Sequence, residues 1–467
     1  MPFLCTLLKS GNGRTPLHPD NDATRLAGLL CPYAGSLRRI ALPRGAIFVS
    51  QLAGIGEGPT VCSIPERTSK APQTAWLEIT SDDGGLRFET DPLGTFPLWV
   101  YEDEERLVIT GEVKALLALE NVRVDFQPGA PWDHRKRAPD FSPYRNVRRV
   151  LPGAILHVRF HPRLSVVEQG GSPLVYRPAS MLPPEEYAES LDAAIEASAQ
   201  SIGPGNGGWG TFLSAGIDSS VTTSLMARLH PKLETFTLGT EHGDEYADAE
   251  DLATTLGTRH TRVVAGVATA RRHFDRAVFC NETIDGLTAE TLAQLGILAE
   301  AAASRGVRHV VTGYGADLLF GSMLRHELYM IVTGVDDLQS LIERTFWSGE
   351  FAPFYAWSLG VELHHLFWDP SLMNCAFRIP PEASFDGTRE KLVLRRIAIW
   401  RRYLEERHAF RRKQAMTDGT QFNRILSAAL GLASAYAYDD KNAACASRLS
   451  ELFRSPGGPS TFSHAAE

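Results

Sequence analysis

The sequence is poor in cysteine and contains no long apolar run, and these two absences exclude several classes of protein. The 467 residues include six cysteines and no CxxC pair; the cysteines are Cys5, Cys31, Cys62, Cys280, Cys375 and Cys445. Cysteines scattered in this way exclude a zinc ribbon and a disulfide-dense framework, so we expect mostly buried, reduced thiols. No apolar stretch approaches the ~18–20 residues that cross a bilayer, and the first residues lack the regions of a signal peptide. We therefore expect a cytoplasmic protein without a membrane partner.

An excess of basic charge is also absent. Lys and Arg number 47 against 55 Asp and Glu, which gives a net charge of −8. This balance argues against binding of nucleic acid through bulk charge, and we expect no nucleic-acid partner. The apolar fraction of 43% and the charged fraction of 22% are ordinary for a soluble globular protein, and the length predicts two or three domains.

The pattern of apolar residues changes near residue 165. Residues 1–165 contain short apolar runs between turn signals, which predict strands near 75–79, 86–89, 107–110 and 154–158. Residues 166–184 are rich in Gly, Ser and Pro and are predicted to be a linker. The last residues, 456–467, are predicted to be a disordered tail.

Residues 185–455 alternate between strand-like and helix-like patterns. A helix is expected from Pro184, followed by strands at 211–213, 234–238, 260–264 and 309–312 and by helices near 220–229 and 246–256. Such alternation predicts a parallel sheet covered on both faces. The expected fold class is therefore α/β in the second part of the chain, after an α+β first part.

Two loops follow strands of this expected sheet and carry residues suited to phosphate chemistry. The first, LSAGIDSS, has small residues, hydroxyls and a helix start that favour an anion, and it is not a Walker A loop because no Gly-Lys-Ser/Thr follows. The second, VTGYGADLLFG, repeats the order of strand, glycines and acid. Since ligands bind beyond the carboxyl ends of parallel strands, Asp218 and Asp317 are expected to share Mg²⁺. The alternative for the first loop is an ordinary capped helix start.

These loops resemble those of the asparagine synthetase B family of ATP pyrophosphatases. LSAGIDSS is similar to the SGGxDS pyrophosphate loop, TGYGADLLFG to the second loop, and TREKLVLRRI to the lysine-bearing helix. The resemblance implies an N-terminal glutaminase-like sandwich of the Ntn-hydrolase type, a C-terminal ATP-pyrophosphatase domain, and ATP with Mg²⁺ as its requirements. The residues it assigns to ATP or pyrophosphate are Leu213, Ser214, Gly216, Ser219, Ser220, Leu238, Gly313 and Lys391.

The N-terminal domain departs from the glutamine-using members of the family. Those members need a cysteine at position 2, whereas this sequence has Pro2 there, and Cys5 lies inside the expected first strand. We therefore expect a domain without glutaminase activity.

The second loop is similar to that of β-lactam synthetase and carbapenam synthetase, where a tyrosine works with a later glutamate. This resemblance assigns the pair to Tyr314 and Glu350, and RRKQAMTDGTQFNRIL resembles that branch's late loop, which assigns its catalytic lysine to Lys413. It implies a small β-amino acid substrate that is adenylated and closed to a β-lactam. The oligomeric state cannot be read from the sequence, and a homodimer is one state that it allows. The individual alternatives are a packed aromatic for Tyr314, a surface acid for Glu350 and a solvated basic run for Lys413.

Ala215 stands where the family has the second glycine of its pyrophosphate loop. If this position needs φ > 0, alanine costs about 1–2 kcal/mol there. Three other functions stay open from the sequence: a macrolactam synthetase acting on a peptide, a glutamine-independent asparagine synthetase-like ligase, and a catalytically inactive relative used for binding.

Overall fold

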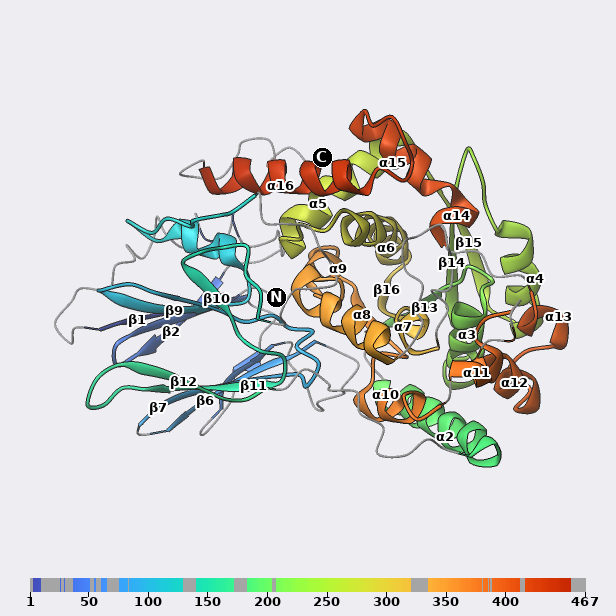
Figure 1. The fold of residues 1–467 in the computed structure, drawn as a ribbon, viewed down its shortest axis with the longest axis horizontal. Helices are drawn as coiled ribbons and strands as arrows, with labels where there is room; N and C mark the ends of the chain where they lie inside the picture. Colours follow the sequence, from blue (N-terminus) through green and yellow to red (C-terminus); the bar gives the residue numbers. More distant parts are fainter. Residues whose placement is uncertain are drawn as a thin grey trace.

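A computed structural model places two antiparallel sheets beside a parallel sheet and its helices (Figure 1). The residues that it describes are 3–9, 26, 29, 37–50, 54–55, 60–64, 75–82, 84–128, 140–171, 183–203, 207–320, 335–379, 381–384, 386, 389–411 and 416–454. Pro2, Lys413 and the expected tail 456–467 lie outside these residues.

The N-terminal part is a sandwich of two six-stranded antiparallel sheets. One sheet has the order β10 (Val147–Arg149), β8 (Trp99–Glu102), β9 (Arg106–Thr110), β1 (Phe3–Leu8), β3 (Gly45–Ser50) and β2 (Leu37–Leu42). The other has the order β12 (Ser165–Gly170), β11 (Ala154–Arg159), β7 (Gly85–Thr90), β6 (Leu77–Asp82), β5 (Thr60–Ile64) and β4 (Gly54–Ile55). Phe3 of the first sheet faces Phe88 of the second with ring centroids 6.2 Å apart, so both sheets contribute to one core. The expected β-sandwich is confirmed.

The predicted start of the linker is wrong. β12 pairs with β11 from Ser165, opposite Arg159, to Gly170, opposite Ala154. Its residues are exposed or half-buried because β12 is an edge strand with a solvated side, and such a strand needs few apolar residues. The Gly, Ser and Pro content of 166–184 therefore concealed a strand. The helix expected from Pro184 is present as α2 (Pro184–Ile202).

The second part contains a five-stranded sheet in which every neighbouring pair is parallel. Its order is β15 (Arg259–Ala265), β14 (Glu234–Thr240), β13 (Gly208–Phe212), β16 (Val307–Thr312) and β17 (Glu362–His365). Two helices cover it from opposite faces, α3 (Ile217–Leu229) and α6 (Gly286–Ser304). The parallel sheet predicted from strand–helix alternation is confirmed, and β17, whose sequence ELHH has one apolar residue, is an addition to it.

The other helices surround this sheet and join the two parts. They are η1 (Val113–Ala118), α4 (Tyr246–Leu256), α5 (Val267–Asn281), α7 (Ala316–Leu319), α8 (Val335–Ser348), α9 (Phe354–Ser358), α10 (Pro370–Ala376), α11 (Pro381–Ser384), α12 (Leu392–Trp400), α13 (Glu406–Ala409), α14 (Met416–Thr420), α15 (Phe422–Leu430) and α16 (Tyr438–Arg454). α16 runs across the top of the molecule in Figure 1, and its Phe453 packs on Tyr144 of the sandwich part at 5.2 Å between ring centroids. One apolar core thus continues from the sandwich into the helices of the second part.

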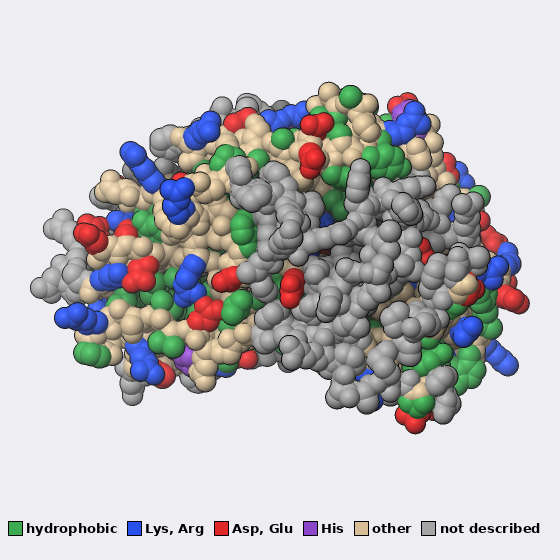
Figure 2. All heavy atoms as spheres, viewed as in Figure 1, with side chains coloured by type: hydrophobic (Ala, Val, Ile, Leu, Met, Phe, Trp, Pro, Cys, Tyr) green, Lys and Arg blue, Asp and Glu red, His purple; other side chains and the backbone are tan. Residues whose placement is uncertain are grey.

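The distribution of charge on the surface and the character of the helices are as the amino-acid composition predicts. On the face shown in Figure 2, acidic and basic side chains are interspersed over the described part of the sandwich. Across the described ranges, no helix has both the length and the apolar character needed to traverse a bilayer.

Candidate active site

The two loops singled out from the sequence meet at the carboxyl edge of the parallel sheet. The first follows β13 and enters α3, and the second follows β16 and enters α7. A Cβ on Gly313 would lie 2.6 Å from the carbonyl carbon of Asp218 and 2.7 Å from the amide nitrogen of Ser219, so only glycine fits where the loops touch. The neighbouring β13 and β16 therefore bring both loops to one place, as expected for an open parallel sheet.

A cavity lies between these loops and the end of β14. The predicted site residues that line it are Leu213, Ser214, Gly216, Asp218, Ser219, Leu238, Gly313, Tyr314 and Asp317. Ser219 shapes the first loop, since its hydroxyl accepts a hydrogen bond from the Ser214 amide and donates one to the Gly216 carbonyl, both at 3.1 Å. Ser220 was expected to offer a donor to phosphate, but its side chain is fully buried in the first turn of α3 and does not line the cavity.

Lys391 joins the two loops through charge. Its ammonium contacts Asp218 and lies 2.6 Å from an Asp317 carboxylate oxygen, while the lysine side chain is fully buried. Burial alone would lower the pKa of Lys391, but the two aspartates raise it well above its usual value. The lysine is therefore a fixed positive charge at the edge of the cavity.

The same two aspartates suit a hard cation. Asp218 Oδ1 is buried and has no hydrogen-bond partner among the described residues, so the carboxylate has coordination capacity that the protein leaves unused. Carboxylate oxygens are the ligands that Mg²⁺ takes in nucleotide sites. Asp218 and Asp317 thus fit the Mg²⁺ expected from the sequence.

A second buried network begins at Tyr314, which also lines the cavity. The phenol of Tyr314 donates a hydrogen bond to Glu350, and Arg344 lies 3.8 Å from the other oxygen of that carboxylate. Arg344 in turn donates to Asp285 at 3.0 Å, and Asp285 caps α6 by accepting from the Thr288 amide at 2.7 Å. The surface-acid alternative for Glu350 does not hold, because the residue is 8% exposed and paired.

The electrostatics of this network favour a proton acceptor. Burial raises the pKa of Glu350 above the ordinary carboxyl value, while Arg344 and the Tyr314 hydrogen bond oppose that shift. Burial and the neighbouring Glu350 raise the pKa of Tyr314 far above its usual value, so the phenol stays protonated. Phe351 packs on Tyr314 at 5.1 Å between ring centroids and stacks on Trp368 at 4.0 Å, which gives the pair an apolar wall.

Sequence reasoning missed three charged residues of the site. Arg344 and Asp285 belong to the network at Glu350, and Glu245 lines the cavity between the two loops. Burial raises the pKa of Glu245 to about 7, against the opposing effect of Arg411 at 2.9 Å. Of these three residues, Asp285 alone has a sequence signal, because an aspartate directly before an Ala-rich helix is typical of an N-cap.

The segment that carries Lys413 lies outside the described residues, and the residues before and after it are next to the cavity. Arg411 pairs with Glu245, a lining residue, and Thr420 itself lines the cavity. The Thr420 carbonyl accepts a hydrogen bond from Thr240 at 2.5 Å, which holds it beside the end of β14. The role of Lys413 stays a prediction.

Ala215 has the backbone conformation that was expected to cost it energy. Its φ is +52°, in the left-handed region that favours glycine, and its side chain is 3% exposed. The first loop therefore holds an alanine in a backbone conformation that favours glycine.

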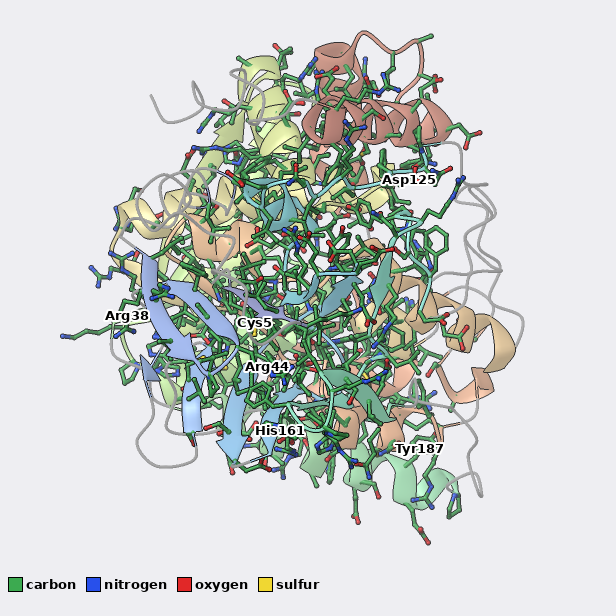
Figure 3. All side chains as sticks on the ribbon, turned by 90° about the vertical axis from the view of Figure 1, so that its left-hand side faces the viewer. Cys5, Arg38, Arg44, Asp125, His161 and Tyr187 are labelled. Atoms are coloured by element: carbon green, nitrogen blue, oxygen red, sulfur yellow. The ribbon has the colours of Figure 1, made fainter. Side chains whose placement is uncertain are left out.

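Cys5 is unsuited to replace the missing cysteine nucleophile. It lies inside β1, as expected, and Figure 3 shows it among the packed side chains of the sandwich. Burial and the neighbouring Cys62 raise the pKa of its thiol far above the usual value, which disfavours the thiolate that attack requires.

Comparisons with known proteins bear on the resemblance that these two loops suggested. A model of the asparagine synthase family matches residues 186–348 and 355–458. The chain belongs to the asparagine synthase family. The matched ranges contain both loops and Lys391, whereas Glu350 falls in the gap between them.

Two curated relatives illustrate the range of this family. The chain is 27% identical over 308 residues to "Carboxyethyl-arginine beta-lactam-synthase" of Streptomyces clavuligerus, covering 66% of this chain and 57% of the relative. It is 24% identical over 266 residues to "Asparagine synthetase B [glutamine-hydrolyzing]" of Escherichia coli (strain K12), covering 51% of this chain and 46% of the relative. The match thus spans about half the length of these relatives. Among solved structures, the chain is similar to NMN synthetase from Francisella tularensis at 14% identity and a TM-score of 0.26. The match covers 59% of this chain and 97% of that one, and a TM-score this low carries no functional conclusion.

Proposed function

We propose that the chain is an ATP- and Mg²⁺-dependent amide ligase that closes a β-amino acid to a β-lactam and releases AMP and pyrophosphate. The observation that carries this proposal is the buried contact between Tyr314 and Glu350 beside the nucleotide cavity. The similarity to a relative named for β-lactam synthesis supports the same reaction.

The first half-reaction needs the carboxylate of the substrate to be activated. Its oxygen attacks the α-phosphorus of ATP, the bond to pyrophosphate breaks, and an acyl-adenylate forms. Mg²⁺ bound by Asp218 and Asp317 would neutralise phosphate charge. Lys391 would add a fixed positive charge, and the backbone of the first loop would donate to the pyrophosphate at the start of α3.

The second half-reaction needs an unprotonated amine. Glu350 takes the proton from the substrate ammonium, and its raised pKa brings its basicity closer to that task. The amine then attacks the acyl carbon, and the new C–N bond closes the ring. AMP leaves with the electrons of the broken C–O bond, and its phosphate takes up the second proton that the ring nitrogen loses. Lys413 is proposed to stabilise the oxyanion of the tetrahedral intermediate.

Water must be kept from the adenylate while the ring closes. The stacked Phe351 and Trp368 rings beside Tyr314 provide an apolar wall that disfavours water there. A small folded substrate fits such a wall better than an extended peptide, which is why we favour β-lactam formation over macrolactam formation.

The test is mass spectrometry of the protein incubated with ATP, Mg²⁺ and a panel of β-amino acids and short peptides. We expect AMP release coupled to a small product that is lighter than its substrate by one water. Glu350→Gln should slow ring closure by about 10²–10⁴-fold and retain ATP–pyrophosphate exchange, because adenylation does not use the base. Glu406→Gln, an exposed glutamate on α13, is the matched control and should leave both steps unchanged. Dehydration of peptides alone would replace the proposal with macrolactam formation, and absence of AMP with every substrate would refute it.

A further inference from the structure

Three potential metal ligands lie together on the paired strands β16 and β17. They are His309 near the start of β16 and Glu362 and His364 on β17. His309 and Glu362 are register partners in the parallel pair, and His364 is two residues beyond Glu362. Side chains alternate along a strand, so all three point to the same face of the sheet.

The distances between the ligand atoms suit a tetrahedral ion. His309 Nδ1 lies 3.4 Å from His364 Nε2 and 3.5 Å from Glu362 Oε2, and the three atoms are all within 4.8 Å of one another. Two ligands held tetrahedrally at ~2.0–2.1 Å from Zn²⁺ are about 3.3 Å apart. Elsewhere in the described ranges, no other three His, Cys, Asp or Glu residues come together in this way.

The surroundings hold the rings in place and leave a way in from solvent. Trp209 stacks on His309 at 4.7 Å and 20° and on His364 at 5.6 Å and 23°, so both imidazoles are nearly parallel to one indole. The side chains of His309 and Glu362 are 16% and 19% exposed. A preformed ligand set with partial exposure is what a metal ion needs to enter without rearrangement.

We propose that His309, Glu362 and His364 form a binding site for a divalent transition metal of the zinc class, with the remaining position left to water. Two imidazoles and one carboxylate are a ligand set that selects such ions over Mg²⁺. The site is separate from the Asp218–Asp317 pair and independent of the proposed ligase reaction.

The expected effect of the ion is to fasten the edge strand. Among the described strands, β17 pairs with β16 alone, and one ligand from β16 with two from β17 would tie the pair together. The far end of this pair supports the active-site loop, since Thr312 Oγ1 lies 2.8 Å from His365 Nδ1 and accepts from the Tyr314 amide at 3.2 Å.

The test is a Co²⁺ titration of the full-length, untagged and chelator-stripped protein, followed by its d–d absorption in excess Mg²⁺, with Zn²⁺ as competitor. We expect one Co²⁺ per chain with a tetrahedral spectrum, displacement by Zn²⁺, and a Zn²⁺-dependent rise in Tm. Glu362→Gln and His309→Gln should each weaken binding roughly 100-fold or more. His230→Gln is the matched control, because His230 stacks on the same Trp209 at 4.3 Å and is not one of the three ligands.

Asp317→Asn separates this site from the nucleotide site. Unchanged Co²⁺ binding in Asp317→Asn, together with its loss in Glu362→Gln at an unaltered Tm in chelator, would support the proposal. The absence of Co²⁺ binding in the unmodified protein, unchanged binding in both Glu362→Gln and His309→Gln, or its loss in Asp317→Asn would overturn it.

Discussion

Replacing Ala215 with glycine tests whether the pyrophosphate loop is strained. The left-handed φ of +52° costs an alanine about 1–2 kcal/mol, and glycine removes that cost. Two effects oppose the gain: glycine raises the entropy of the unfolded chain, which costs about 0.4–1 kcal/mol, and a buried methyl group is lost, which costs about 0.8 kcal/mol. The free energy of unfolding of Ala215→Gly should therefore stay within about 1 kcal/mol of the parent.

The same substitution in a relaxed helix gives a matched control. Ala253 lies in α4, is 1% exposed and belongs to the same apolar cluster as Ala215. Ala253→Gly loses about 0.8–1.0 kcal/mol of helix propensity and the same methyl burial, and should destabilise by about 1.7 kcal/mol. Urea unfolding of the two variants side by side measures the difference, which equals the strain at Ala215 within the spread of these values.

Strain and catalysis are then read separately. If strain in the loop slows adenylation, Ala215→Gly should also raise the rate of ATP–pyrophosphate exchange, whereas Ala253→Gly should not. Equal destabilisation of the two variants would refute the strain at Ala215. Unchanged exchange with a neutral free energy of unfolding would show that the loop is strained without slowing catalysis.

Three further predictions follow from the buried charges. Tyr314→Phe removes a hydrogen bond that lowers the pKa of Glu350, so that pKa should rise. Because only the carboxylate accepts a proton, the acid limb of the pH profile of ring closure should move to higher pH, and a shift to lower pH would contradict this. Lys391→Met leaves the carboxylates of Asp218 and Asp317 without their shared ammonium, so it should slow ATP–pyrophosphate exchange about 10²–10³-fold and lower the Tm. Mg²⁺ should partly restore the Tm, and equal Tm values with and without Mg²⁺ would count against a shared ion. Arg344→Gln removes the cation that pairs with the buried Asp285 and should lower the free energy of unfolding by about 3–5 kcal/mol in urea. The control is Arg407→Gln, which removes a surface ion pair; equal losses of stability in the two variants would refute the importance of the buried pair.

Several residues that meet at the carboxyl edge of the sheet could be located from the sequence. A glycine-rich loop after a strand has few conformations, so LSAGIDSS and TGYGAD located Asp218 and Asp317, and the resemblance paired Tyr314 with Glu350, which lie in contact. The helix predicted over 246–256 has the bounds of α4, because its apolar spacing is clear and Gly257 caps it at φ +69°.

The features that were missed depend on contacts between distant segments. Arg344 looks like any basic residue of an amphipathic helix until α8 is packed against the start of α6, where Asp285 meets it. β17 is four residues long and polar, so only its pairing with β16 makes it a strand. β12 was mistaken for linker for the same reason, since its pairing with β11 is what makes a solvent-facing segment extended.

The buried network explains why Glu350, and not another acid of the site, is suited to take a proton. Asp285 and Glu350 are both buried and both lie against the guanidinium of Arg344. Arg344 lies closer to Asp285, at 3.0 Å against 3.8 Å, and Asp285 also accepts from the Thr288 amide at the start of α6, so these contacts stabilise the charge of Asp285 more than that of Glu350. In the proposed reaction, a proton from the substrate ammonium would neutralise Glu350, which lowers the cost of burying that carboxyl group. Tyr314 orients the Glu350 carboxylate through a hydrogen bond but does not protonate it, because the pKa of the phenol is too high for it to give up its proton.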